Sequence, residues 1–262
     1  MAAGTPPFVG VGVALVTLFN ADLSVDAPAT AELAGRLVDA GLAAVLVAGS
    51  TGEAAALTSA ERTALLEAVG VAIRPRGAVL IAGTGAPAAG QAARFTADAA
   101  QHGADAALAL SPPWAADPRP YYDEVAKAAD GLPLLAYHFP AASAPGIPVP
   151  LLAELPVVGC KDSSGDCDRL LETLTAWDGH LYTGSSAVVS YAAQLGLAGA
   201  ILALANAEPE LCVRSFAAGP EGGDAQRRLA AAHTAMRTGG FPTAIKQLTA
   251  ARWGTSPAAR LG

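Results

Sequence analysis

Short apolar runs recur along the chain, and a longer segment of mixed apolar and polar residues separates each run from the next. There are eight such runs, and they occupy residues 11–16, 43–49, 78–83, 106–111, 132–137, 156–161, 180–184 and 199–204. Strands of a parallel sheet that is covered on both faces are apolar nearly throughout, whereas a strand with one face in water alternates. The pattern therefore predicts eight buried strands.

The segments between the runs have the features of helices. Thr58 is followed three residues later by Glu61, which is the capping-box pattern of a helix start, and Leu65, Val69 and Ile73 then repeat at a spacing of four residues. Further helices are predicted at residues 27–40, 86–102, 119–130, 148–155, 168–176 and 187–196.

This alternation of strand and helix predicts an α/β fold, a (β/α)8 TIM barrel. A doubly wound open sheet is compatible with the same pattern and is the alternative. After residue 204 the strands stop and three helix-like segments follow. We therefore expect residues 1–204 to form the barrel and residues 205–262 to form a C-terminal helical extension. No linker separates the two parts, so the extension is expected to pack on the barrel as a single structural unit.

Composition argues against several kinds of partner. The net charge is −7 and no basic run occurs, which argues against nucleic acid because phosphate binding requires a basic face. No stretch of about 20 residues is apolar throughout, so no membrane span is expected. The three cysteines lack a metal-ligand spacing, which indicates a reducing cytoplasm and no metal site.

In a barrel, the residues that act on a substrate lie where the strands end, at the carboxyl-terminal mouth. That rule selects four places, which are GSTGE at 49–53, YHFP at 137–140, Lys161, and GSS at 184–186. Lys161 is the most informative, because it follows an apolar run in a chain with only three lysines. Its amine is either paired with the adjacent Asp162, or desolvated with a lowered pKa and able to attack a ketone.

Tyr137 ends the strand before that of Lys161, so a barrel would bring its phenol to the same cavity. A phenol beside an imine can move protons to and from a substrate, and an ordinary core tyrosine is the alternative. The GSTGE turn offers hydroxyls and closely spaced amides that can receive a carboxylate. The GxxxxGK[ST], HExxH and GxSxG patterns are absent from the sequence, so phosphate-loop, zinc hydrolase and serine hydrolase chemistry have no support.

Together, the blocks ALVTLF, GSTGEAAALTSAER, YHFPAAS, VVGCKDSSGD, YTGSSA and GAILALAN resemble the dihydrodipicolinate synthase / N-acetylneuraminate lyase family. The resemblance extends over most of the chain. It implies a (β/α)8 barrel, a Schiff base on Lys161, proton transfer by Tyr137, and no metal or other cofactor. It also implies a homo-oligomer, either a dimer or a tetramer.

The resemblance implies further site residues. Ser50 and Thr51 occupy the positions of the family's paired hydroxyl residues, so Ser50 is expected to relay protons and Thr51 to bind the carboxylate of a keto acid. Ser163 stands where a residue faces the substrate in several aldolases of the family. The backbones of Gly184 and Ile201 occupy positions that line the pocket.

Two positions depart from the pattern of the synthases. Ala142 stands where an arginine usually holds a substrate carboxylate, and the nearest arginine that follows is Arg169. Trp114 stands where a second tyrosine is usual, while Tyr121 and Tyr122 come later, on the following predicted helix. An indole N–H donates a hydrogen bond but does not relay a proton as a phenol does.

The expected function is that of a cytoplasmic Schiff-base lyase or aldolase that acts on a 2-oxo acid. It would cleave or form a carbon–carbon bond with pyruvate as one partner, in the manner of the 4-hydroxy-2-oxoglutarate and 2-keto-3-deoxy sugar acid aldolases. Three alternatives stay open. They are a 4-hydroxy-tetrahydrodipicolinate synthase that condenses pyruvate with aspartate semialdehyde, a sugar-acid dehydratase, and a keto-acid-binding member of the family without catalytic activity.

Overall fold

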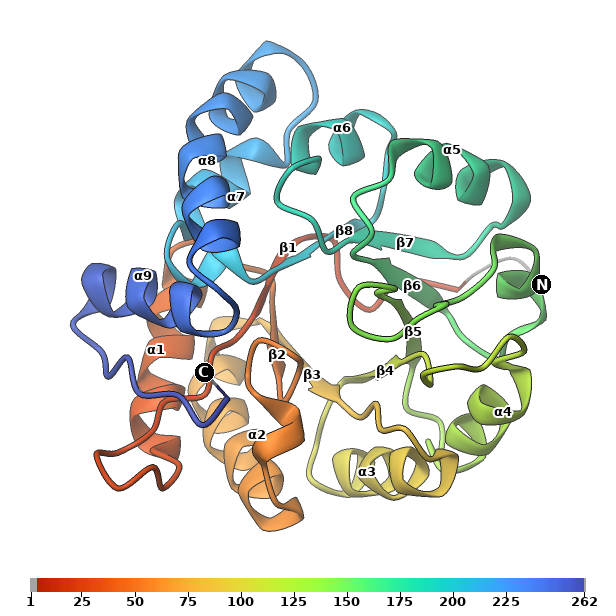
Figure 1. Cartoon of the computed structure of the whole chain (residues 1–262), viewed down its shortest axis with the longest axis horizontal. Coiled ribbons are helices and arrows are strands. Elements are labelled where there is room, and N and C mark those ends of the chain that lie inside the picture. Colours follow the sequence, from red (N-terminus) through yellow and green to blue (C-terminus); the bar gives the residue numbers. More distant parts are fainter. Residues whose placement is uncertain (1–3, 262) are drawn as a thin grey trace.

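The eight predicted strands form a closed parallel barrel (Figure 1). The computed structural model describes residues 4–261, so residues 1–3 and 262 lie outside the description. Each strand pairs with its successor along the chain, and β1 closes the barrel by pairing with β8. The TIM barrel prediction is confirmed, and the open-sheet alternative is wrong. The strands are β1 (Gly10–Ala14), β2 (Ala44–Val47), β3 (Val79–Gly83), β4 (Ala106–Leu110), β5 (Leu134–His138), β6 (Gly159–Asp162), β7 (His180–Thr183) and β8 (Gly199–Leu202).

Helices surround the barrel, and most of them begin close to the predicted positions. The capping box of α2 is present, because the Thr58 hydroxyl accepts from the Glu61 N–H and the Glu61 carboxylate accepts from the Thr58 N–H. The helices between strands are α1 (Ala27–Asp39), α2 (Ser59–Ile73), α3 (Ala89–Gln101), α4 (Arg119–Lys127), α5 (Cys167–Ala176) and α6 (Val189–Gln194).

The connection between β5 and β6 differs from the prediction. A helix is expected at 148–155, but the chain makes only a 3-10 segment, η3 (Val149–Glu154). Pro148 and Pro150 stand at its start, and proline has no N–H to give to a helical hydrogen bond. Six residues with these prolines are too few for an extended α-helical ladder, so the tighter 3-10 form results.

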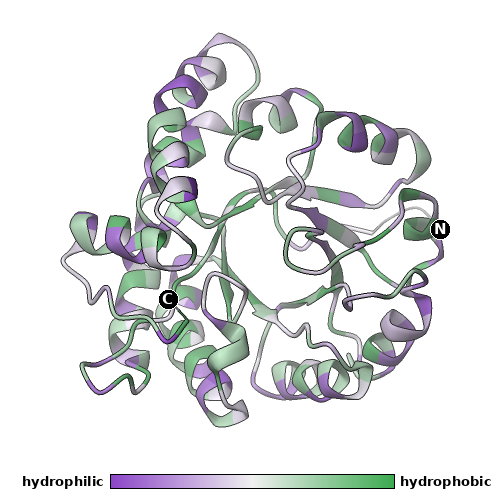
Figure 2. Ribbon diagram, viewed as in Figure 1, coloured by the Kyte–Doolittle hydropathy of each residue, from purple (hydrophilic) through white to green (hydrophobic). Residues whose placement is uncertain are grey.

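The apolar core has an inner and an outer part. Inside the barrel, alternate strand residues such as Leu46, Leu108 and Leu135 pack together with Tyr137 and Ile201. The other strand residues face the helices and form two larger apolar clusters with them. Figure 2 shows the same division, with apolar strands at the centre and polar residues on the outward faces of the helices. Tyr137 and Ile201 therefore belong to the barrel interior.

Three further helices follow β8, as the sequence predicts. They are α7 (Pro209–Ser215), α8 (Pro220–Thr238) and α9 (Thr243–Trp253). Helix α7 packs against β1 and α8, and α8 in turn contacts α6 and α9 (Figure 1). Leu211, Leu229 and Ile245, one from each helix, belong to the same apolar cluster as Val11 and Val13 of β1. The extension thus shares its core with the barrel. Among residues 4–261, no helix is both long enough and apolar enough to cross a membrane.

Candidate active site

The strand register places Lys161 beside Tyr137 at the carboxyl-terminal mouth. Tyr137 of β5 pairs with Lys161 of β6, and Lys161 pairs with Tyr182 of β7. Residues that pair across parallel strands point to the same face, so the three side chains enter the barrel together. The Lys161 Nζ lies 4.3 Å from the centroid of the Tyr137 ring.

Lys161 is a desolvated amine. The residue is 4% exposed, and burial lowers the pKa of its amine to about 7 because desolvation disfavours the ammonium form. The adjacent Asp162 does not pair with it, since the Asp162 carboxylate lies 2.7 Å from the Arg169 Nε and also accepts from Ser164. The paired-lysine alternative is therefore wrong, because Asp162 is committed to Arg169.

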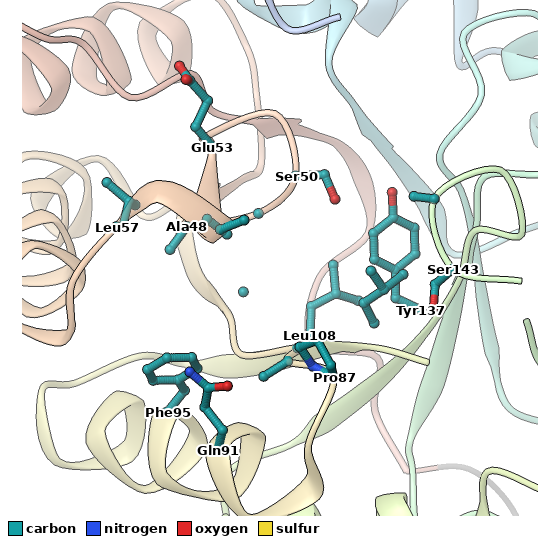
Figure 3. Close-up of a pocket in the computed structure, with 18 of the residues that line it drawn as sticks. Ala48, Ser50, Glu53, Leu57, Pro87, Gln91, Phe95, Leu108, Tyr137 and Ser143 are labelled. Carbon is teal, nitrogen blue, oxygen red and sulfur yellow. The ribbon is translucent and has the colours of Figure 1, made fainter. Parts of the chain in front are cut away.

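The Tyr137 phenol lies among hydroxyl groups. The Ser163 Oγ donates to its oxygen over 3.3 Å, and the Ser50 hydroxyl is a second hydrogen-bonding neighbour. In Figure 3 the Ser50 and Tyr137 hydroxyls point toward each other across the mouth. Burial raises the pKa of Tyr137 to about 12, so the phenol holds its proton at neutral pH. It can donate this proton and recover one through a neighbouring hydroxyl.

Position 184 requires a glycine because neighbouring side chains lie very close to its backbone. A Cβ added there would lie 1.8 Å from the Ser163 Oγ and 2.7 Å from the Lys161 Cε. Any side chain at this position would displace both groups. Ile201 is 1% exposed and packs in the barrel interior, so it forms part of the floor below the mouth.

A cavity of about 560 Å³ opens at this mouth. Ser50 and Tyr137 are in its wall together with Ser111, Ala142 and Ser143. Lys161, Ser163 and Gly184 reach the site through their contacts with Tyr137 and with one another. Within the described residues the cavity wall does not include Thr51, which is buried on the same turn as Ser50.

The turn that carries Ser50 is held from several sides. The Glu53 N–H donates to the Ser50 carbonyl over 3.1 Å, and the Thr17 hydroxyl donates to the Gly52 carbonyl over 2.7 Å. Glu53 adopts a left-handed φ of 56°, which turns its side chain away from the cavity, as Figure 3 shows. Its carboxylate is fully buried in an ion pair with Lys246 of α9.

The segment 255–261, which we call the C-terminal strap, binds this turn from outside. The Glu53 carboxylate accepts hydrogen bonds from the backbone N–H groups of Arg260 and Leu261. The Arg260 guanidinium pairs with Glu61 and stacks on the Phe19 ring. The Arg260 hydrogen bonds lower the pKa of Glu61 to about 2. Leu261 reaches the cavity wall, so the strap is part of the mouth.

The two positions that depart from the synthase pattern have different surroundings. Ala142 lines the cavity and leaves that part of the wall without a cation. Arg169 cannot take over the role, because it binds Asp162 and the Ile147 carbonyl. Trp114 is 88% exposed and is not in the cavity wall, while Tyr122 is buried on α4 and donates to the Ala109 carbonyl.

Sequence reasoning misses several residues of the cavity wall, among them Ser111, Arg62 and Leu261. Ser111 follows β4, and its buried hydroxyl has no hydrogen-bonding partner among the described residues. The rule that strand ends carry function could have selected it, since it closes the fourth apolar run. Arg62 carries no such signal because it lies inside a helix. Leu261 carries none because it lies 57 residues beyond residue 204, where the last predicted strand ends. Among residues 4–261, no three His, Cys, Asp or Glu side chains gather as a metal site would require.

The structure places the protein in the class of closed (β/α)8 barrels that have a buried lysine and a tyrosine side by side at the carboxyl-terminal mouth. The model of the dihydrodipicolinate synthetase family matches residues 7–248. The chain belongs to this family, whose members include lyases and synthases.

Individual relatives agree with this assignment. An uncharacterized DapA-like lyase of Halobacterium salinarum is 33% identical over 256 residues, covering 90% of this chain and 82% of the relative. A 4-hydroxy-tetrahydrodipicolinate synthase of a Synechococcus species is 32% identical, covering 74% of this chain and 68% of the relative. The crystal structure of dihydrodipicolinate synthase from Aquifex aeolicus superposes with a TM-score of 0.87 at 26% identity, covering 97% of this chain and 91% of that one.

Proposed function

We propose that the chain is a lyase or aldolase that forms a Schiff base between Lys161 and the ketone of a 2-oxo acid, with pyruvate as one partner. The observation that carries the proposal is the state of the Lys161 amine, which is buried, has no carboxylate partner among the described residues and is adjacent to the Tyr137 phenol. With a pKa near 7, a large fraction of the amine is neutral and nucleophilic at physiological pH.

In the cleavage direction, the Lys161 nitrogen attacks the C2 ketone, and the Tyr137 phenol gives its proton to the departing hydroxide, so that water leaves and a protonated imine and a phenolate result. The C4 hydroxyl then gives its proton through Ser50 to the Tyr137 phenolate, the C3–C4 bond breaks, and an aldehyde departs. The electron pair of that bond moves onto the imine and forms an enamine. Protonation at C3 and hydrolysis then release pyruvate and the free amine.

The other site residues bind and shape the substrate in this proposal. Ser50 and Thr51, on the turn after β2, receive the carboxylate next to the ketone, and Ser163 holds the phenol of Tyr137. Gly184 and Ile201 form the wall and floor. Catalysis is proposed to need no metal or other cofactor, and the enzyme is proposed to act as a homo-oligomer, a dimer or tetramer, in the cytoplasm.

The wall around Ala142 favours a lyase over a 4-hydroxy-tetrahydrodipicolinate synthase. A bidentate arginine holds a carboxylate with a geometry that an alanine cannot replace, and Arg169 is already bound to Asp162. Turnover of 4-hydroxy-2-oxoglutarate or a 2-keto-3-deoxy sugar acid is expected to exceed turnover of pyruvate with aspartate semialdehyde. Efficient condensation with aspartate semialdehyde would contradict this preference.

Borohydride trapping tests the Schiff base directly. Reduction in the presence of pyruvate is expected to add one reduced pyruvate to the intact chain, located at Lys161 by peptide mass spectrometry. Lys161→Ala should gain no mass, whereas Lys127→Ala, which removes an exposed lysine, should label like the parent protein. The proposal is wrong if the parent protein gains no adduct or if the Lys161→Ala variant gains the same one.

A further inference from the structure

The segment between β7 and α6, which we call the β7–α6 turn (residues 184–188), lies against the Lys161 site. Its first residue has no room for a side chain, because a Cβ on Gly184 would lie 1.8 Å from the Ser163 Oγ and 2.7 Å from the Lys161 Cε. The Gly184 N–H also donates to the Asp162 carbonyl over 2.6 Å. The position of this turn therefore determines how tightly Lys161 and Ser163 are packed.

Gln226 of α8 joins the β7–α6 turn to the helix that follows it. Its amide nitrogen donates to the Ser186 carbonyl over 2.8 Å, and its amide oxygen accepts from the Ser190 N–H over 3.1 Å. Ser190 is in the first turn of α6, where backbone N–H groups have no partner within the helix. Val188, which precedes this helix, has no side-chain oxygen to cap it. Gln226 therefore supplies from α8 the cap that the α6 segment lacks.

His233 is the second contact between α8 and the turn. Its Nδ1 lies 2.8 Å from the Ser186 hydroxyl, and Ser186 is buried. Gln226 and His233 are seven residues apart, or about two helical turns, so they lie on the same face of α8. Leu229 lies between them on this face and belongs to the apolar core that α8 shares with the barrel. Helix α8 is thus anchored in the core and binds the turn through two side chains.

We propose that Gln226 and His233 are positioning residues for Lys161, which hold the β7–α6 turn against the lysine and Ser163. They act through hydrogen bonds to Ser186 and Ser190, and their role in catalysis rests on the proposed Schiff base. A loosened turn would admit water to the Lys161 amine. Because burial is what lowers the pKa of this amine, its pKa should then rise toward the ordinary value.

Competitive acetylation with trace acetic anhydride reports on the Lys161 amine without any keto acid. The reagent acylates neutral amines, and peptide mass spectrometry follows Lys161 and the exposed Lys127 in the same sample. Between pH 6 and 11, the Lys161 rate of the parent protein is expected to level off above a midpoint near 7. Gln226→Met and His233→Leu should each raise this midpoint by about one pH unit, while the Lys127 profile stays unchanged.

Two further variants on α8 are the controls. His233→Asn keeps an amide group close to the position of the imidazole Nδ1 and should retain the parent midpoint. Arg228→Gln, which removes an exposed charge, should retain it as well. A merely structural role would lower the free energy of unfolding without moving the Lys161 midpoint. The proposal is overturned if a folded Gln226→Met or His233→Leu variant keeps the parent midpoint, or if either control shifts as they do.

Borohydride trapping separates this proposal from the proposed function. If Lys161 forms the imine, trapping of pyruvate at pH 7 should be about fivefold slower in Gln226→Met and His233→Leu, which is the loss of neutral amine for a midpoint one unit higher. A parent protein that traps no pyruvate, with variants that still move the Lys161 midpoint, would contradict the Schiff base and support the positioning role.

Discussion

The three lysines of the chain have three different environments. Lys127 is exposed on α4, Lys246 is buried against Glu53, and Lys161 is buried with no carboxylate within ion-pair distance among the described residues. Desolvation without compensation lowers an amine pKa, whereas a carboxylate partner raises it. The chemistry proposed for Lys161 therefore depends on the ion pair between Arg169 and Asp162, because this pair leaves the Lys161 amine without Asp162 as a partner.

The pH dependence of imine formation should reflect the pKa of Lys161. Only the neutral amine attacks a ketone, so the initial rate of borohydride trapping with pyruvate is expected to rise with pH and to level off above a midpoint near 7. An ordinary lysine would give a midpoint above 10. The measurement is a series of quenched trapping reactions from pH 5.5 to 9.5, and a rate that still climbs steeply above pH 9 would contradict the lowered pKa.

At the scale of elements, the turn after β2 depends on α9 and the C-terminal strap. Glu53 joins all three, because its carboxylate pairs with Lys246 and accepts two backbone N–H groups from the strap. Removing one partner of a buried ion pair leaves the other charge uncompensated. The Ser50 turn is therefore expected to lose order when this pair is broken.

Lys246→Met is expected to lower the free energy of unfolding by about 3–5 kcal/mol, measured by urea denaturation. Arg252→Gln is the control on the same helix, because Arg252 and its partner Glu210 are about half exposed and such pairs contribute about 1 kcal/mol or less. A loss of similar size in the two variants would contradict the role assigned to the buried pair.

The strands could be predicted from sequence because each of them is a short apolar run, and the barrel followed from their number and alternation with helices. The start of α2 at Thr58 could be predicted from the sequence because a capping box is a local signal. Contacts between residues that are distant in the sequence could not be predicted in this way. Arg62 lies inside a helix pattern, and nothing local indicates that its guanidinium reaches the Gly83 carbonyl. The same holds for the strap, where Glu53 and Arg260 are 207 residues apart.

At the scale of the whole molecule, the local charge of the mouth opposes the overall charge. The chain carries a net charge of −7, yet Arg62 in the cavity wall is a cation without a carboxylate partner among residues 4–261. At physiological ionic strength, charges further away than about 8 Å are largely screened. The electrostatic energy of an anionic substrate inside the cavity therefore depends more on this nearby cation than on the distant surface charges.

Burial of the Lys161 amine is expected to reduce the stability of the fold. Its pKa of about 7 in the folded chain lies below the ordinary value, so between these values the unfolded chain binds a proton that the folded chain does not. The penalty is thus complete below pH 7 and disappears as pH rises toward 10. Lys161→Met should stabilise the protein by about 1–4 kcal/mol at pH 6.5. The gain should shrink at pH 9.5, and a gain that grows with pH in thermal or urea unfolding would contradict this account.

The C-terminal strap also has a consequence for genetic screens of this protein. Its residues are distant in sequence from Lys161 and Tyr137, and its Arg260 side chain is bound to Glu61. An unbiased screen for inactive alleles should nevertheless recover changes at Lys246 and Arg260 together with changes at Ser50, because all of them act on one turn. Substitutions at residues 246–260 would then share a phenotype with substitutions at the mouth itself.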